Sequence, residues 1–326
     1  MSDEVQHADP SSEPGERPAA PPANPGQLSR PAFLMNPPFS YTCDVANNIW
    51  MEELTDSERA PEPHLAFTQF LDLYSYVASE ALVTLLPTPR TTGLQDLVFT
   101  ANLGIVLEHV EDRNTVVISN FTSPPRRGET PVGTEFFRSM GYRAHVPEAR
   151  FEGEAELKHL RGNVYVGGYG QRTDAAAYTW MEETFGMEVV KLRMTDPRLY
   201  HLDGSVFPLT SEQTLVCTAQ YEPAEILELE KQTEIIDVDE DVAYSGICNS
   251  VRLNNVILNA SNLHELKAGT DDYDTEVRKN RKLEDIASRL AFEVSYFNLS
   301  EYLKGGALLS CMMMHLNRFS YSFRLL

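Results

Sequence analysis

The sequence predicts a single α/β domain, and two observations lead to this prediction. Short strand-like runs alternate with helix-like segments along most of the 326 residues, and no linker-like stretch divides them, which is the pattern of a layered α/β fold. The apolar content of 42% is sufficient for a full core. We therefore expect one folded unit that follows an N-terminal tail.

The first thirty residues differ from the rest of the chain in composition. They consist largely of Pro, Ser, Glu, Ala and Gly, and such a segment cannot bury enough apolar surface to offset the entropy lost on ordering. We predict a disordered tail over residues 1–30 and a folded domain over residues 31–326. The first strand is expected at residues 33–35, where apolar side chains begin.

The clearest helix lies between two prolines. Apolar side chains recur at helical spacing over residues 65–82, with Pro63 before them and Pro87 after them. Beyond this helix, strands and helices are expected in alternation. The predicted strands cover residues 96–106, 115–121, 163–166, 189–193, 215–219, 251–258 and 294–299, and the predicted helices cover residues 131–140, 174–185 and 274–292.

Residues 222–241 form a heavily acidic stretch that is rich in Glu, Ile and Leu. We expect a solvated helix face and an exposed loop, because charged runs usually face water. A docking segment for a partner is the alternative. This stretch suggests no pocket for a second substrate, and the sequence shows no internal repeat.

Charge and cysteine content exclude several classes of protein. The formal net charge of -21 argues against nucleic acid or anionic membranes as partners. No apolar run reaches the roughly 20 residues that span a bilayer, and the chain does not begin with a secretory signal. The four cysteines form no C-x-x-C pair, so we expect neither a metal site nor a disulfide framework. A cytoplasmic protein is expected.

Three polar segments between apolar runs carry residues that could do chemistry. They are Phe151-Glu152-Gly153, Tyr200-His201-Leu202-Asp203 and the stretch from Gly305 to Leu316 that contains Cys311. Alternation would place His201 and Asp203 on one side of an extended chain. A thiolate nucleophile needs a base, and an imidazole base needs an orienting carboxylate, so Cys311, His201 and Glu152 form a candidate set. Each also has an ordinary alternative as a core or surface residue.

Seven segments occur in the order in which one enzyme superfamily carries them, and they span most of residues 35–316. They are Pro37-Pro38 to Trp50-Met51, Gly93 to Asn102, Pro125 to Glu129, Phe151-Glu152-Gly153, Gly168 to Asp174, Tyr200 to Asp203 and Gly305 to Cys311. The chain thus resembles the amidinotransferases, arginine deiminases and dimethylarginine dimethylaminohydrolases. The resemblance implies a five-bladed α/β-propeller, called the pentein fold, and an enzyme that needs no metal or organic cofactor.

The resemblance also implies covalent catalysis by three residues. Cys311 would be the nucleophile, His201 the general acid and base, and Glu152 the carboxylate that orients His201. Attack of the thiolate on the central carbon of a guanidino or ureido group would give an S-linked intermediate, which water then releases. Glu154 competes with Glu152 for the orienting role, because relatives tend to have a Gly-Asp pair where this chain has Glu154-Ala155-Glu156.

Further residues are implied in substrate binding. Asp96 and Asp203 would hold the guanidinium, while Arg127 and Arg172 would bind the α-carboxylate, because carboxylates suit guanidinium donors and an Arg fork suits a carboxylate. Hydrolases of methylated arginine usually carry a second acidic residue after the position of Asp96. This chain has Asn102 there, and its neutral amide makes a ureido group an alternative substrate. The expected partner is a small guanidino or ureido amino acid.

We therefore expect a cysteine-dependent hydrolase most similar to dimethylarginine dimethylaminohydrolase. Three alternatives stay open: an amidinotransferase that passes the amidino group to an amine, a hydrolase of citrulline-type ureido compounds, and a non-catalytic pentein scaffold. Hydrolysis and transfer differ only in the second nucleophile that reaches the intermediate. The oligomeric state also stays open, a homodimer being one option.

Overall fold

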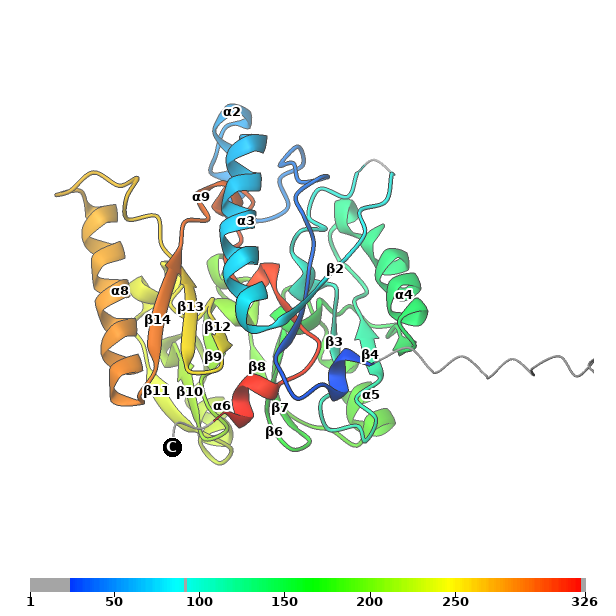
Figure 1. The fold of residues 1–326 in the computed structure, drawn as a ribbon. Helices are drawn as coiled ribbons and strands as arrows, with labels where there is room; N and C mark the ends of the chain where they lie inside the picture. Colours follow the sequence, from blue (N-terminus) through cyan, green and yellow to red (C-terminus); the bar gives the residue numbers. More distant parts are fainter. Residues whose placement is uncertain (1–23, 91–92, 324–326) are drawn as a thin grey trace, which may run out of the picture.

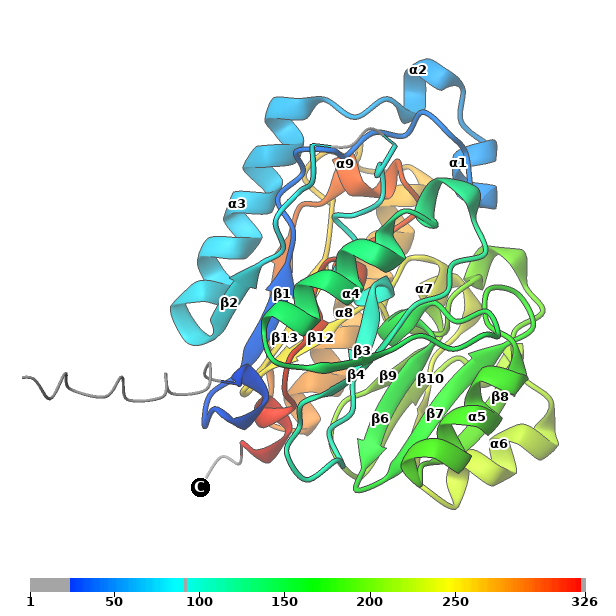
Figure 2. The ribbon, with the colours of Figure 1, turned by 90° about the vertical axis from the view of Figure 1, so that its right-hand side faces the viewer.

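The computed structural model describes residues 24–90 and 93–323. Over these residues the chain forms five three-stranded sheets that surround a common centre, with helices on the outside (Figures 1 and 2). The sheet orders are β15-β1-β2, β3-β4-β5, β6-β7-β8, β11-β10-β9 and β12-β13-β14. The arrangement is the five-bladed α/β-propeller that the resemblance implies.

The secondary structure consists of short strands, helices and single-turn 3-10 helices (η). The strands are β1 (Ala32–Met35), β2 (Leu82–Leu85), β3 (Gly104–Val106), β4 (Thr115–Ile118), β5 (Arg143–His145), β6 (Leu157–Arg161), β7 (Val164–Tyr169), β8 (Glu188–Arg193), β9 (Val206–Pro208), β10 (Gln213–Val216), β11 (Glu234–Asp237), β12 (Val251–Leu253), β13 (Val256–Ala260), β14 (Glu293–Phe297) and β15 (Met314–His315). The helices are α1 (Ile49–Glu52), α2 (Asp56–Arg59), α3 (Pro63–Glu80), α4 (Glu129–Ser139), α5 (Ala175–Phe185), α6 (Pro223–Glu230), α7 (Glu240–Tyr244), α8 (Asp271–Arg289) and α9 (Ser300–Leu303). Four of the 3-10 helices matter for the site: η2 (Thr100–Asn102), η4 (Gly153–Ala155), η6 (Leu202–Gly204) and η8 (Ser310–Met312).

Each sheet is built by the same path of the chain. Two antiparallel strands are followed by a helix and by a third strand that lies parallel to the second; for example, β7 pairs antiparallel with β6 and, across α5, parallel with β8. The first sheet is completed by the end of the fold, because β15 pairs antiparallel with β1. The fivefold repeat is therefore one of backbone path, and it does not require repeated residues.

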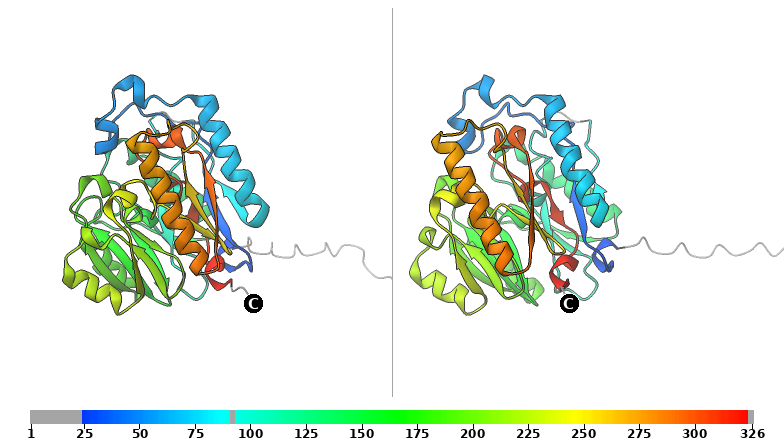
Figure 3. Two further views of the ribbon diagram at one scale, coloured as in Figure 1. Left: turned by 90° about the vertical axis from the view of Figure 1, so that its left-hand side faces the viewer. Right: turned by 60° about the vertical axis from the view of Figure 1, so that its left-hand side comes forward.

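The predicted helices form where their apolar faces meet the sheets. Helix α3 begins at Pro63, whose preceding residue Glu62 accepts two backbone N–H groups of the first turn, and it buries Phe70, Leu73 and Val77. Helices α3 and α8 lie on the outer side of the sheets in both views of Figure 3. Within the described residues, buried apolar side chains gather in five clusters between sheets and helices. In the same part of the chain, none of the helices is both long enough and apolar enough to cross a bilayer.

Two predicted strands are wrong in extent. Only the last part of the predicted strand 96–106 is extended, since Thr100 bends the chain into η2 by donating its hydroxyl to the backbone carbonyls of Leu34 and Met312. The predicted strand 251–258 is a hairpin of β12 and β13, because Asn254 takes a φ of 54° between them. Asparagine tolerates this left-handed conformation better than most residues.

The acidic segment also differs from its prediction. Residues 222–241 contain α6, β11 and the start of α7, and β11 pairs parallel with β10. The expected exposed loop is therefore wrong in part: the half-buried Ile235 and Ile236 pack against apolar clusters, while acidic side chains face outward.

The folded part begins earlier than predicted. Residues 24–30 are described, and the side-chain amide of Asn317 donates to the backbone carbonyls of Pro25 and Arg30 at 2.9 and 3.0 Å. This segment was expected in the tail, but it packs against the end of the fold. Residues 1–23 of the predicted tail lie outside the described residues.

Candidate active site

The residues of the site lie on turns that precede the first strand of each propeller unit. Asn102 ends η2 before β3, Glu152 caps η4 before β6, and His201 caps η6 before β9. Asn249 lies just before β12, and Cys311 lies in η8 before β15. Because the units surround a common centre, these turns bring residues that are far apart in sequence into contact.

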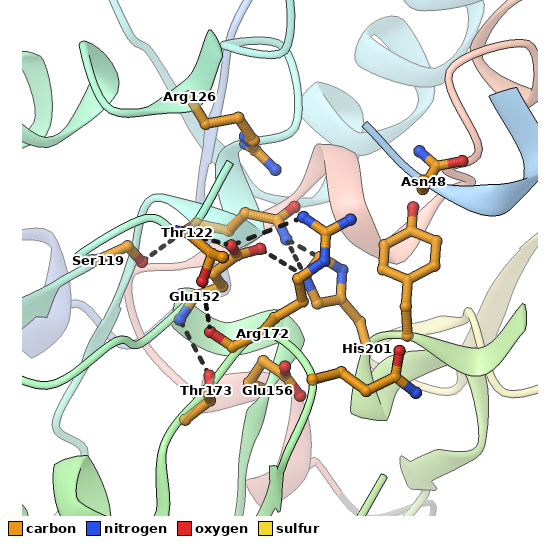
Figure 4. Close-up of polar contacts among 12 residues, drawn as sticks. Asn48, Ser119, Thr122, Arg126, Glu152, Glu156, Arg172, Thr173 and His201 are labelled. Carbon is orange, nitrogen blue, oxygen red and sulfur yellow. Dashed lines mark hydrogen bonds and ion pairs between the residues drawn. The ribbon is translucent and has the colours of Figure 1, made fainter. Parts of the chain in front are cut away.

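Glu152 and His201 form a buried pair at this centre (Figure 4). Glu152 Oε2 lies 2.8 Å from His201 Nε2, and both side chains are buried. Burial opposes ionisation of Glu152, but the His201 hydrogen bond and charge, helped by Arg172, lower the pKa of the carboxyl to about 2. Burial lowers the pKa of His201 although Glu152 opposes this. Glu152 therefore stays ionised and is placed to orient the His201 ring.

Gly153 explains why Glu152 can reach this place. Its φ is +68°, and a Cβ there would lie 2.6 Å from the carbonyl oxygen of Ala101. Only glycine permits both this conformation and this approach. The turn that carries Glu152 consequently packs directly on the turn that carries Asn102.

The side-chain amide of Asn102 also contacts the His201 ring and lies near both of its nitrogens. Its side-chain Nδ2 lies 3.3 Å from His201 Nδ1, and its side chain is buried. With Nε2 of His201 donating to Glu152, Nδ1 is the unprotonated ring atom and accepts from the Asn102 amide. The neutral amide of Asn102 thus lies where an acidic residue would have placed a negative charge.

Cys311 is held by residues from two other units. Asn249 Nδ2 donates to Cys311 Sγ at 3.4 Å, and Asn249 Oδ1 accepts the backbone N–H of Ser310 at 2.8 Å. Asp203 Oδ2 accepts from Ser310 Oγ at 2.6 Å and from Cys311 Sγ at 3.4 Å. Burial raises the pKa of the Cys311 thiol to about 12, and the Asp203 charge adds to the rise. The thiol is therefore protonated in the free protein.

His201 and Asp203 come together by a different route from the predicted one. They do not alternate along an extended chain, because residues 202–204 form η6. Both side chains are buried, and His201 contacts Glu152 while Asp203 contacts Cys311. The turn therefore links the contact with Glu152 to the contact with Cys311.

Glu154 lies away from this site. Its Oε1 is 2.5 Å from His315 Nδ1 and 2.9 Å from Arg318 Nη2, and its Oε2 accepts the backbone N–H of His315. In the competition for the orienting role, the geometry therefore favours Glu152, the carboxylate that touches His201.

Two cavities meet at Cys311. The first is small, with a volume of about 20 Å³, and is lined mainly by polar residues. The residues that matter for chemistry there are Asp96, Asn102, Arg126, Arg172, His201 and Cys311. Asn47 closes part of it: its side-chain amide donates to Asp96 Oδ2 at 2.6 Å, and its backbone carbonyl accepts from Arg172.

The second cavity has a volume of about 100 Å³ and is also lined by Cys311 and His201. Asp203, Asn249 and Tyr244 also line it. Asp203 and Asp96, which the resemblance pairs around one guanidinium, thus open on different cavities. None of the residues 222–241 of the acidic stretch lines this cavity.

Of the two adjacent arginines, Arg126 and not the predicted Arg127 lines the first cavity. The Arg126 guanidinium is buried and makes two hydrogen bonds to Glu129, at 2.9 and 3.0 Å. Arg127 is exposed and donates to the backbone carbonyl of Thr122 at 3.3 Å. The sequence alone could not show which of the two arginines points into the cavity, because tertiary contacts determine the conformation of the turn that carries them.

Sequence reasoning also missed Asn249 and Asn47. Neither belongs to one of the three segments with chemical character, although Asn47 falls within a segment of the resemblance. The repeated backbone path is the signal that could have indicated Asn249, since it occupies the place before β12 that Glu152 occupies before β6. Among the described residues, no group of three or more His, Cys, Asp or Glu side chains is placed to hold a metal ion.

The fold and the site together define a class. A five-bladed α/β-propeller that brings Cys311, His201 and Glu152 to its centre has the architecture of the pentein superfamily. Residues 39–318 match the family model described as N,N dimethylarginine dimethylhydrolase, eukaryotic. The chain belongs to this family.

Two relatives align with most of this chain. AgrE of Nostoc sp., a bifunctional arginine dihydrolase/ornithine cyclodeaminase, is 30% identical over 87% of this chain and 37% of AgrE. The chain therefore spans little more than a third of AgrE. The N(G),N(G)-dimethylarginine dimethylaminohydrolase of Mycobacterium tuberculosis is 28% identical over 87% of this chain and 85% of that protein.

Solved structures show the same fold. The N-terminal domain of ArgZ, a cyanobacterial arginine dihydrolase, is 27% identical, with a TM-score of 0.76 over 88% of this chain and 97% of that chain in its product complex. An Asn-to-Ser variant of that domain, with a TM-score of 0.75, is covalently bonded to a reaction intermediate. A dimethylarginine dimethylaminohydrolase adduct, at 18% identity and a TM-score of 0.62, shares the fold.

Proposed function

We propose that this chain hydrolyses the guanidino group of free arginine in two steps, first to a ureido product and then to ornithine. The single observation that carries the proposal is the buried amide of Asn102 against the His201 ring. A carboxylate can only accept hydrogen bonds, whereas an amide both donates and accepts. Asn102 can therefore serve a cationic guanidinium and a neutral ureido group in turn.

Cys311 is the nucleophile in both steps. Its thiol proton passes to His201, and Sγ attacks the central guanidino carbon; the approaching cation favours the thiolate, which burial alone disfavours. His201 returns the proton to the departing nitrogen, ammonia leaves, and an S-linked amidino intermediate remains. Water, deprotonated by His201, adds to this carbon, and the C–S bond breaks to give citrulline.

The second step repeats these bond changes on citrulline. Sγ attacks the ureido carbon, a second ammonia leaves, and water releases the S-linked carbamoyl group as the carbamate of ornithine, which loses carbon dioxide. In total, arginine and two waters give ornithine, carbon dioxide and two ammonia molecules. The arginine dihydrolase names of AgrE and ArgZ support this substrate.

The charged residues of the first cavity fit the amino-acid end of arginine. We assign its α-carboxylate to Arg172, with Arg126 behind it, because both guanidinium groups line this cavity. Asp96 is available to its α-ammonium once Asn47, which now contacts both Asp96 and Arg172, has moved. Asp203, which lies beside Cys311, is assigned to the guanidino end of the substrate.

The test is an assay of the purified chain with arginine, its methylated forms and citrulline, with and without glycine as acceptor. We expect two ammonia molecules per ornithine from arginine, turnover of citrulline, and no need for glycine. Preferred turnover of methylated arginine would reassign the substrate, and turnover only with glycine would identify an amidinotransferase. The Cys311→Ser variant is the inactive control.

The Asn102→Asp variant tests the role of the amide. We expect it to release citrulline from arginine and to lose turnover of citrulline, because a carboxylate cannot donate to a neutral ureido oxygen. Product analysis by chromatography measures the citrulline to ornithine ratio. An unchanged ratio would contradict the role given to Asn102.

A further inference from the structure

A third buried carboxyl group follows Glu152 and Glu154 in the same turn, and the mechanism above does not use it. Glu156 is fully buried, and its Oε2 accepts the backbone N–H of Leu202 at 3.2 Å. Leu202 is the residue between His201 and Asp203. We propose that Glu156 is a positioning residue, which fixes the peptide between the base and the Cys311 contact. The inference rests on the proposed function of the site.

The space for this carboxyl group is built into the sheet. A Cβ at Gly168 of β7 would lie 2.8 Å from Glu156 Oε2 and 3.1 Å from the Cβ of Leu202. A side chain at position 168 would therefore push the carboxyl group and the Leu202 turn apart. Glycine at this place is required by the contact, because any larger residue would break it.

The other carboxyl oxygen has no evident structural use. Glu156 Oε1 is buried and makes no hydrogen bond to any described residue, and a buried oxygen without a partner destabilises a fold. A hydrophobic residue would fill the same place without this penalty. Retention of a polar group at such a position is expected where it serves the site rather than stability.

Glu152 and Glu156 together hold the catalytic turn at two points. Glu152 contacts the His201 ring at Nε2, and Glu156 contacts the backbone one residue further on. Both glutamates belong to the turn around η4, so one segment of the chain holds both the His201 ring and the backbone next to it. Figure 4 draws both side chains with His201. Displacing a catalytic group by about 1 Å can lower the rate on the order of 10²-fold.

Glu156 performs this role without adding charge. The charged groups that face it are Glu152, Asp203 and Arg172, and burial followed by the Glu152 charge raises the pKa of Glu156 well above its usual value. A neutral carboxyl group still accepts the N–H of Leu202. Glutamine should therefore replace Glu156, whereas an apolar residue of similar size should not.

The experiment compares Glu156→Gln with Glu156→Leu. We expect E156Q to keep kcat and the pH profile of wild type, and E156L to lower kcat about 10- to 100-fold with little change in the KM for arginine. In E156L the acidic limb of the kcat/KM profile should move to lower pH, because a His201 ring that leaves Glu152 loses the partner that raises its pKa. The control is Glu154→Gln in the same turn, which should leave the pH profile unchanged.

Three outcomes would overturn the inference: wild-type kcat in E156L, equal loss in E156Q and E156L, or a pure KM effect. Circular dichroism melts first establish that the variants fold; if E156L does not, Glu156→Asp, one methylene shorter, takes its place with the same expectation. If wild type turns over neither arginine nor citrulline, the proposed function fails. The inference is then tested by the pKa of the His201 ring, measured by NMR. This pKa should differ from wild type in E156L but not in E156Q.

Discussion

At the scale of single residues, burial sets the charge states on which the chemistry depends. It raises the pKa of Cys311 and lowers that of His201, while the contact with His201 keeps Glu152 ionised. The Cys311 thiol is therefore protonated in the free protein, while the Glu152 carboxyl group is ionised. In the proposed reaction the cationic substrate favours the thiolate, so that activation of Cys311 is tied to binding.

The two neighbouring arginines give a prediction at this scale. Arg126→Ala should raise the KM for arginine and lower the free energy of unfolding by roughly 3 kcal/mol, because Glu129 would lose its partner in the interior. Arg127→Ala, the matched surface control, should change stability by less than about 0.5 kcal/mol. Steady-state kinetics and urea titrations measure both. A raised KM in R127A with a normal KM in R126A would restore the assignment made from the resemblance.

At the scale of elements, the site depends on turns that pack on one another. Gly306, before η8, has a φ of +74°, and a Cβ there would lie 2.4 Å from Asn48 Oδ1. That oxygen accepts the N–H of Met51 and so caps α1, while Asn48 Nδ2 donates to the carbonyl of Gly305. The segment over the first cavity and the turn that carries Cys311 are therefore fixed together.

Gly306→Ala tests this connection. It should lower stability by about 2 kcal/mol or more and reduce kcat/KM at least about tenfold, since both the backbone conformation and the Asn48 contact are lost. Gly269→Ala is the matched control: its φ is +85°, but nothing lies within 4 Å of the added carbon. Thermal melts and kinetics of the two variants separate the contact from the backbone strain. Equal effects would show that the Asn48 contact contributes nothing.

At the scale of the whole molecule, the propeller is closed by its two ends. Strand β15 pairs antiparallel with β1, Met314 opposite Leu34, so the first sheet contains strands from both ends of the fold. This pairing makes β1 the central strand of its sheet, so that β1 is not left as an exposed edge. Closure also places η8, and with it Cys311, at the centre.

Met314→Asp should therefore affect the entire fold. Met314 is fully buried, and an unpaired carboxylate there should destabilise by more than about 4 kcal/mol, with loss of the cooperative transition and of activity. Leu227→Asp on α6, where the side chain is 59% exposed, should change stability by less than about 0.5 kcal/mol. Urea unfolding followed by fluorescence checks both. A modest, local effect of M314D would mean that closure does not hold the propeller together.

Helix periodicity gave correct predictions where one face packs on a sheet, as in α3, α5 and α8. The strand predicted over residues 96–106 and the exposed loop predicted within residues 222–241 were wrong in part, because the side-chain hydrogen bonds of Thr100 and the parallel pairing of β11 with β10 involve residues distant in sequence. The same limit explains Arg127: only the fold decides which of two adjacent arginines turns inward.

The sequence by itself determined the α/β class and, through ordered motifs, the family and the candidates Cys311, His201 and Glu152. Motifs record residue types and spacing, and both are properties of the chain. Only the tertiary structure decided that Glu152 rather than Glu154 meets His201, that Asn249 holds Cys311, and that Asp96 and Asp203 open on different cavities. These contacts depend on how five turns pack together at the centre of the propeller, and a local sequence pattern carries no information about that packing.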